Sequence, residues 1–163
     1  MIQVFISHPT PFNNNQDSFL KLLKKELEER GLNPVNLGKN NWSFKSPMQP
    51  IKELMIHSKA VVVVGLERFH DYIGYAKQHS KYEVEYVHKF RSSSWIQIEA
   101  GMAYMVGIPI LILKEKNIEK EGILDPNVSE FYVFEFDIEE QLTELSEELK
   151  AIIDNWSQHI STI

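Results

Sequence analysis

Ala60-Val61-Val62-Val63-Val64-Gly65 is the stretch that decides the fold of this chain. It is continuously apolar and mostly β-branched, without the alternation of apolar and polar residues that marks a strand with one solvated face. A strand that is apolar on both faces belongs in the middle of a parallel sheet covered by helices. The sequence therefore predicts an α/β fold, and the flanking segments are read as its other strands and helices.

Four further segments have the composition of strands. Ile2–Ser7 and Ile108–Leu113 are short apolar runs, which indicate buried strands. Pro34–Leu37 reads as an edge strand, and Phe131–Phe136 reads as the last strand. With the central segment, they predict a five-stranded sheet.

Helices are predicted between these strands from apolar stripes and end signals. Asp17 or Ser18 is expected to cap the first helix, and Gly31 ends it in a left-handed conformation. Pro47 or Pro50 is expected to open the second helix.

Two more helices are expected in the second half of the chain. Ser94 is expected to cap a helix over Trp95–Val106, which Gly107 ends. Asp137 is expected to cap the last helix. Its apolar stripe is formed by Ile138, Leu142, Leu145, Leu149 and Ile152. Strand–helix units repeated about five times predict a doubly wound, mostly parallel sheet with helices on both faces, of the flavodoxin-like kind.

The chain reads as one domain over residues 1–163, with a long insertion at about 66–93. A weak helical pattern around Tyr82–Phe90 predicts that the insertion is partly helical, and long insertions often act as lids over a site. His70, His79 and His88 lie in it nine residues apart, which is not a metal-ligand spacing. We therefore predict no metal site.

Composition excludes several classes of function. The chain has no cysteine, so it has neither disulfides nor thiolate metal sites. A net charge of −6 argues against a nucleic-acid surface, because neutralising phosphates requires clustered Lys and Arg. The apolar runs are too short to cross a membrane, and the first residues lack the features of a signal peptide. We expect a cytoplasmic protein whose partner is a small molecule.

Glu99 is the candidate catalytic residue. On the predicted helix, Trp95 and Glu99 are neighbours at i and i+4, and Met102 continues the same face. A carboxylate among apolar side chains is costly to bury, so Glu99 has either a functional role or a structural partner. One carboxylate can stabilise or trap the cation that forms when a base leaves a ribose.

Further candidates follow from the expected topology, because ligands in such folds bind outside the carboxyl ends of the strands. Ser7 and His8 end the first strand, and the third helix starts at Ser94. Arg68 follows the central strand and can either hold a phosphate or form a surface salt bridge.

Two aromatic residues complete the candidate substrate-binding set. Trp42 and Phe44 lie in the loop after the second strand, where they can stack on a flat aromatic ring of a ligand. Such residues also serve as hydrophobic plugs or subunit contacts.

Two motifs carry a resemblance to known families. Trp95-Ile-Gln-Ile-Glu99 matches the Trp-x-x-x-Glu motif of Toll/interleukin-receptor (TIR) domains, and Val4-Phe-Ile-Ser7 looks like their opening strand. Glu99-Ala-Gly-Met-Ala-Tyr-Met-Val-Gly-Ile-Pro109 is similar to the signature of nucleoside 2-deoxyribosyltransferases. The resemblance spans about Ile2 to Leu113. It departs at Ser92–Ser94, where deoxyribosyltransferases have an Asp-Gly-Thr-like turn, and at Ile96, where TIR domains have Cys.

The resemblance implies a stand-alone prokaryotic TIR-like domain that cleaves NAD, as an NAD hydrolase or ADP-ribose cyclase in immune signalling against phage. Glu99 would stabilise the ribosyl cation, Trp95 would form a wall of the pocket, and NAD would be the substrate, with no added cofactor. The deoxyribosyltransferase likeness implies instead a nucleoside or nucleotide N-glycosidase or a 2-deoxyribosyltransferase. A third reading is a non-catalytic module that binds a nucleotide or self-associates into a homo-oligomer.

Overall fold

A five-stranded parallel sheet forms the centre of the computed structural model, which describes residues 1–38 and 48–163. The order β2-β1-β3-β6-β7 places β3 in the middle, as its continuous apolar sequence predicts. All neighbouring strands of this sheet run parallel. The strands are β1 (Ile2–Ser7), β2 (Leu32–Val35), β3 (Ala60–Gly65), β6 (Ile110–Glu115) and β7 (Val133–Phe136).

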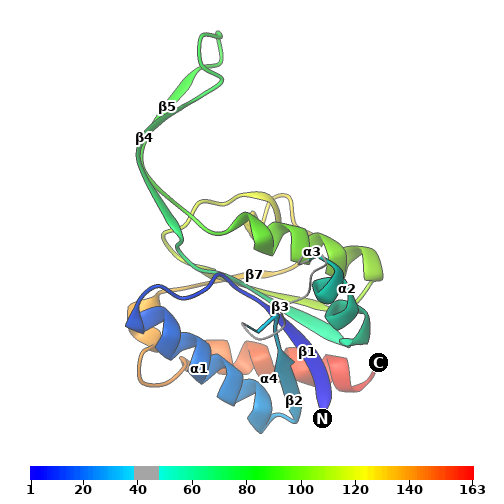
Figure 1. Cartoon of the computed structure of the whole chain (residues 1–163). Coiled ribbons are helices and arrows are strands. Elements are labelled where there is room, and N and C mark those ends of the chain that lie inside the picture. Colours follow the sequence, from blue (N-terminus) through cyan, green and yellow to red (C-terminus); the bar gives the residue numbers. More distant parts are fainter. Residues whose placement is uncertain (39–47) are drawn as a thin grey trace.

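Helices cover both faces of the sheet, so the predicted doubly wound α/β class is confirmed (Figure 1). The part of the chain that the structure describes contains four α-helices, and between β6 and β7 it has only the short 3₁₀ turn η1 (Gly122–Leu124) in place of a helix. The α-helices are α1 (Asn14–Glu29), α2 (Met48–His57), α3 (Ser94–Val106) and α4 (Glu147–Ser161).

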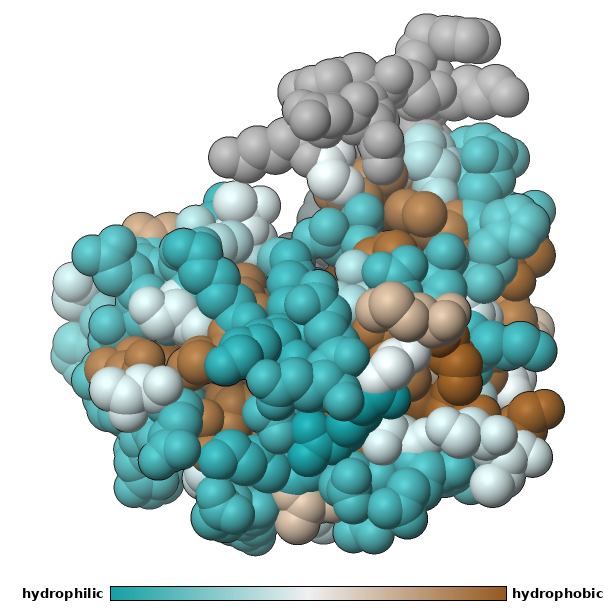
Figure 2. All heavy atoms as spheres, turned by 90° about the horizontal axis from the view of Figure 1, so that it is seen from below, coloured by the Kyte–Doolittle hydropathy of each residue, from teal (hydrophilic) through white to brown (hydrophobic). Residues whose placement is uncertain are grey.

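The core consists of two apolar layers, one on each face of the sheet. The first packs α1 and α4 against β1, β3 and β6 through residues such as Phe19, Leu23 and Ile153. The second packs α2 and α3 against the opposite face through Ile51 and Ala100. Seen from below, the outer surface is largely hydrophilic (Figure 2), as expected for helices that bury one stripe each. Among the described helices, none combines the length and apolar character needed to cross a bilayer.

Two predicted caps of the early helices were wrong. Asn13, not Asp17 or Ser18, caps α1, because its side chain accepts a hydrogen bond from the backbone N–H of Gln16 at 2.9 Å. Ser93, not Ser94, caps α3 by accepting from the backbone N–H of Trp95 at 3.3 Å. In both cases a neighbouring residue of a suitable type competes for the same position.

The end of the chain also differs from the prediction. Asp137 caps only the short 3₁₀ turn η2 (Ile138–Gln141), whereas α4 begins later and is capped by Ser146. Gln141 helps to separate the two, because its side-chain oxygen accepts a hydrogen bond from the backbone N–H of Ser146 at 2.8 Å. The strand boundaries shift by a few residues, and β2 starts at Leu32 directly after Gly31, whose φ of 74° is left-handed as predicted.

The insertion at 66–93 is not helical. It forms an antiparallel pair, β4 (Phe69–Ala76) and β5 (Val84–Arg91), which projects from the body (Figure 1). We call residues 69–91 the arm. The apparent helical pattern around Tyr82–Phe90 comes from β-branched and aromatic residues that pair with β4 instead. At its base, Lys89 pairs with Glu119 of the body at 2.8 Å.

Candidate functional site

The centre of the candidate site is a contact between the first strand and the third helix. The hydroxyl of Ser7, the last residue of β1, donates a hydrogen bond to Oε2 of Glu99 in α3. Both residues are buried, and Glu99 is only 9% exposed. The small residue Ala100 beside Glu99 is fully buried and lets α3 pack closely on the sheet. The carboxylate is therefore held at the carboxyl end of β1, where ligands bind in this class of fold.

Burial governs the charge of Glu99. Removal from water raises the pKa of Glu99 above its ordinary value, and the hydrogen bond from Ser7 lowers it in part. Among the residues that the structure describes, no cation acts on this carboxylate strongly enough to offset burial. A carboxylate with few partners interacts strongly with a positive charge that develops next to it, because little water screens the interaction.

His8 lies beside Glu99, and its ring is held in one neutral form. The carbonyl of Pro9 can only accept, so Nδ1 of His8, 2.7 Å away, carries the proton. Nε2 then accepts from the side-chain amide of Asn36, at 3.1 Å. Burial lowers the pKa of His8, and the nearby ammonium of Lys24 lowers it further, while the Pro9 carbonyl opposes them. The ring therefore acts as a fixed polar wall and does not carry a charge at neutral pH.

Two adjoining cavities meet at Glu99 and His8, and both residues line each of them. The α1-side cavity has a volume of about 340 Å³. Its apolar walls include Phe5 and Leu20, and its polar groups include Asn36 and Lys24. The α3-side cavity has a volume of about 430 Å³. It is lined by His8, Pro9, Thr10, Leu37, Ile51, Arg68, Ser93, Trp95 and Glu99. Cavities of this size hold drug-sized or nucleotide-sized ligands.

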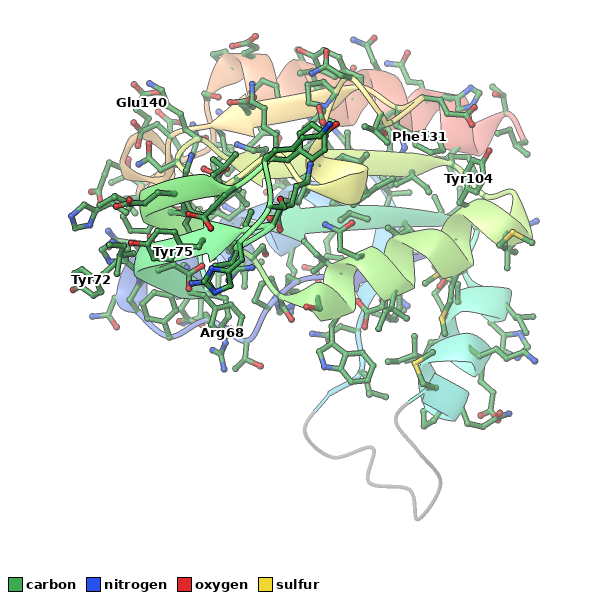
Figure 3. All side chains as sticks on the ribbon, turned by 90° about the horizontal axis from the view of Figure 1, so that it is seen from above. Arg68, Tyr72, Tyr75, Tyr104, Phe131 and Glu140 are labelled. Carbon is green, nitrogen blue, oxygen red and sulfur yellow. The ribbon has the colours of Figure 1, made fainter. Side chains whose placement is uncertain are left out.

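The structure brings together five of the candidate residues named from the sequence. Ser7, His8 and Glu99 form the centre, and Arg68 and Trp95 line the α3-side cavity. Arg68 lies at the base of the arm (Figure 3), and its guanidinium donates to the carbonyl of Thr10 at 3.3 Å. Trp95 is 45% exposed, so one side of its indole is free to contact a ligand.

Other candidates lie elsewhere. Ser94 lines a separate cavity of about 240 Å³ at the base of the arm, which shares only Ser93 with the α3-side cavity. Met102 is partly buried and packs against the apolar layer between α3 and the sheet. Trp42 and Phe44 fall outside the residues that the structure describes.

Sequence reasoning missed several polar residues of the site. Thr10, Lys24 and Asn36 line the α1-side cavity. Thr10 follows β1 and Asn36 follows β2, so the rule that ligands bind beyond the strand ends could have found them. Lys24 gave no such signal, because a lysine on an amphipathic helix normally belongs to its solvated face.

The site has the parts needed to break a glycosidic bond. It offers one desolvated carboxylate, a neutral imidazole, and cationic groups in both cavities, namely Lys24 and Arg68. Within residues 1–38 and 48–163, no cluster of three or more His, Asp or Glu side chains is arranged to hold a metal ion. His70 and His88 do meet on the arm, with Nε2 of the first 3.1 Å from Nδ1 of the second, and neither lines the two cavities at Glu99.

Comparison with known proteins supports the fold. No protein-family model matches the sequence, and no curated protein matches it. Among solved structures, the chain is similar to the CMP N-glycosidase BcmB from Clostridium botulinum, with a TM-score of 0.55 and 15% identity over 94% of this chain and 98% of that one.

A second structure in that comparison is the 2-deoxyribosyltransferase from the psychrotolerant bacterium Bacillus psychrosaccharolyticus. Its TM-score is 0.47 and its identity 9%, over 91% of this chain and 95% of that one. At such identities the likeness concerns architecture alone. The chain therefore shares its fold with the CMP N-glycosidase of Clostridium botulinum over nearly the full length of both.

Proposed function

We propose that the protein is a nucleotide N-glycosidase in which Glu99 acts at the anomeric carbon of the ribose. The observation that carries this proposal is the buried carboxylate of Glu99, held by Ser7 where the two cavities meet. The fold shared with a protein described as a CMP N-glycosidase supports it. So do the motifs around Glu99, which resemble those of enzymes that cleave the same kind of bond.

Glu99 would act as follows. As the bond between C1′ and the base nitrogen breaks, the electron pair leaves with the base and positive charge develops on the sugar. The ionised carboxylate stabilises this charge or forms a covalent bond to C1′, and water then supplies the oxygen of the product. Ser7 keeps the carboxylate in place and, by stabilising its charged form, makes more of it available at neutral pH.

The two cavities suit the two ends of a nucleotide. The α3-side cavity combines Arg68 with the capped N-terminus of α3 at Ser93, and both features favour a phosphate. The α1-side cavity has apolar walls with Asn36 and Lys24 as hydrogen-bonding groups, which suits the flat faces and polar edge of a base. In this orientation the ribose lies at Glu99.

NAD is a second candidate substrate, and Trp95 is the observation that favours it. Its exposed indole lies in the cavity that contains Arg68, so it can stack on a flat aromatic ring while the guanidinium holds a phosphate. Because the nicotinamide of NAD is already cationic, it leaves without protonation. Cleavage would release nicotinamide, and the remaining ADP-ribose would be either free or cyclised.

The test is to incubate the purified protein with CMP, other nucleoside monophosphates, the matching nucleosides and NAD, and to identify the products by chromatography with mass detection. We expect free base and ribose 5-phosphate from a monophosphate, and little turnover of the nucleoside, which lacks the phosphate. Glu99→Gln keeps the shape of the side chain and removes its charge, and it serves as the matched control.

Each outcome assigns the function differently. Nicotinamide release that requires Glu99 would identify NAD as the substrate. Exchange of a labelled free base into the nucleoside would indicate a transferase. Turnover that Glu99→Gln leaves unchanged would reject the proposed role of Glu99. Binding without turnover, unaffected by that substitution, would indicate a non-catalytic nucleotide-binding module.

A further inference from the structure

The lysines of α1 differ in what their ammonium groups meet. Lys21 and Lys25 each form an ion pair with a carboxylate one helical turn away, at 2.6 Å and 3.6 Å, respectively. Lys24 has Glu28 at the same spacing, but within residues 1–38 and 48–163 no ion pair joins Lys24 to a carboxylate. Residues 39–47 contain no Asp or Glu. The positive charge of Lys24 is therefore not neutralised by a carboxylate of this chain.

Lys24 lines the α1-side cavity instead, and so does Glu99. Lys24 is half-buried, whereas the side chains of Lys21 and Lys25 are 75% and 72% exposed. Because α1 and α3 pack on opposite faces of the sheet, Lys24 and Glu99 reach the cavity from different sides. A ligand in this cavity therefore meets the buried carboxylate and an ammonium group that no carboxylate neutralises.

Cleavage of an N-glycosidic bond creates a need for such a cation. When the bond between C1′ and the base nitrogen breaks, the sugar gains positive charge and the base gains negative charge. In the proposed mechanism Glu99 stabilises the sugar, which leaves the base to be stabilised by another group. A negative charge that forms where little water is present is costly unless a cation or a strong hydrogen-bond donor lies beside it.

The imidazole of His8 cannot fill this role. Its Nδ1–H is directed to the carbonyl of Pro9, and its Nε2 accepts from the side-chain amide of Asn36, so the neutral ring has no proton left to donate to a ligand. The ammonium of Lys24 acts on the same ring, where it helps to lower the pKa of His8. Lys24 therefore faces the space that His8 walls.

The other charged groups of this cavity are already paired. Among the described residues, Lys21 and Asp17 also line it, but they neutralise each other. Thr10 and Asn36 carry no charge, and Arg68 lines the α3-side cavity. Of the described groups that line the α1-side cavity, Lys24 is thus the one that can offer an unpaired positive charge to a base.

We propose that Lys24 is a second catalytic residue, which stabilises the departing base while Glu99 acts at C1′. This inference rests on the proposed function. The ammonium donates a hydrogen bond to a ring or carbonyl atom of the base, onto which the electron pair of the broken bond is delocalised. Water then attacks C1′, or the ester that C1′ forms with Glu99, and loses a proton. The base takes up one proton, so a nucleotide and water give ribose 5-phosphate and a neutral base.

Lys24 also limits the class of base that suits the α1-side cavity. A neutral purine or pyrimidine becomes anionic as it leaves, so the ammonium stabilises the transition state more than the bound substrate, which is the condition for catalysis. A base that is already cationic leaves as a neutral molecule. Such a base is repelled by Lys24 when it binds and gains nothing from it when it departs. The α1-side cavity therefore favours an ordinary nucleobase over a cationic ring such as nicotinamide.

The experiment compares two leaving groups in the Lys24→Met chain. The first substrate is a nucleoside monophosphate that the wild-type chain cleaves, and the second is its N-methylated counterpart, such as 3-methyl-CMP for CMP or 7-methyl-GMP for GMP. The base of the second is already cationic and leaves without gaining negative charge. We expect Lys24→Met to lower kcat for the first by on the order of 10²-fold. For the second, kcat should change far less and KM should fall, because the repulsion is removed.

Three further variants complete the test. Lys24→Arg keeps the positive charge and should retain much of the rate that Lys24→Met loses. Lys25→Met removes an exposed lysine of the same helix, so it is the matched control and should cleave both substrates as wild type does. Glu99→Gln should lose both substrates, because each leaves a cationic sugar.

The outcomes separate this inference from the proposed function. A Lys24→Met chain that loses both substrates alike would overturn the role of Lys24 in stabilising the base, since a merely structural defect does not depend on the leaving group. Unchanged kcat for the first substrate would overturn it as well, and both results would leave the role of Glu99 intact. A wild-type chain that cleaves no nucleotide would instead reject the proposed function itself.

Discussion

Two glutamates of this protein, Glu99 and Glu115, are equally buried but differ in their surroundings. Each is 9% exposed, and burial raises the pKa of each above its ordinary value. Glu115, at the end of β6, accepts a hydrogen bond from the backbone N–H of Glu67 at 2.8 Å, which ties the β3–β4 connection to the sheet. Within residues 1–38 and 48–163, Glu99 accepts a hydrogen bond only from the hydroxyl of Ser7, and it lines two cavities.

The comparison teaches that burial of a carboxylate does not by itself mark a catalytic residue. A structural carboxylate satisfies a backbone group that would otherwise remain unpaired. A catalytic one remains open on one side, toward a space that a ligand can fill. In this protein the cavities, and not the raised pKa, distinguish the proposed role of Glu99 from the structural role of Glu115.

The largest expected effect is the loss of activity in Glu99→Gln. In the proposed mechanism the charge of Glu99 stabilises the ribosyl cation, so its removal should lower kcat by on the order of 10³-fold or more, while substrate binding remains. The measurement is single-turnover base release together with equilibrium binding of the substrate. Glu115→Gln, which keeps an acceptor for the Glu67 N–H, is the matched control and should retain most activity. Equal losses in both variants would remove the distinction drawn between the two glutamates.

Glu115→Ala should mainly affect stability. It leaves the backbone N–H of Glu67 unpaired in a partly buried place, which costs about 1–3 kcal/mol. Urea denaturation should show a lower midpoint with an unchanged slope. Glu140→Ala, at an exposed position of η2, should stay within about 0.5 kcal/mol of wild type. An unchanged midpoint in Glu115→Ala would show that the β3–β4 connection is held by other contacts.

The cost of burying Glu99 should appear in the pH dependence of stability. The folded chain holds the Glu99 proton at higher pH than the unfolded chain, because the pKa is raised on folding. The fold therefore loses stability as pH rises from the ordinary glutamate pKa through the raised value, and the full loss is present above it. The Glu99→Gln variant has no carboxyl group to ionise at this position, so it should be more stable than wild type at neutral pH. The difference should vanish in acid, and thermal denaturation at several pH values would check this.

The smallest effect is expected for Ser7→Ala. The Ser7 hydroxyl lowers the pKa of Glu99, so removing it should raise that pKa further and move the acid limb of kcat/KM to higher pH. The rate on the alkaline plateau should change much less than the rate in acid. Ser157→Ala, at another buried serine in α4, should leave the profile in place. A uniform loss of rate at all pH values would instead mean that Ser7 only positions the carboxylate.

The sheet could be predicted from the sequence because its central strands are continuous apolar runs, such as Ala60–Gly65. Such runs can be recognised as buried strands without knowing which strands they pair with. The arm could not. Tyr82, Tyr86 and Phe90 are spaced four residues apart, as on one face of a helix, and only pairing with β4, a nonlocal interaction, decides between the alternatives. Glu99 could be selected as a candidate from the sequence because a carboxylate on an apolar helix face is unusual. Lys24 could not be selected in this way, because it lines the cavity only through the packing of α1 beside the ends of β1 and β2.

The base of the arm has a consequence for engineering. The backbone N–H of Arg68 donates to the carbonyl of Arg91 at 2.8 Å, so the chain returns to the point from which it left. The connection from β3 to α3 therefore begins and ends at the same place, whatever segment lies between Arg68 and Arg91. A longer segment increases the entropic cost of bringing these ends together only slightly. This position is a natural splice site, where a different hairpin or a reporter peptide can be grafted while the sheet and Glu99 stay in place.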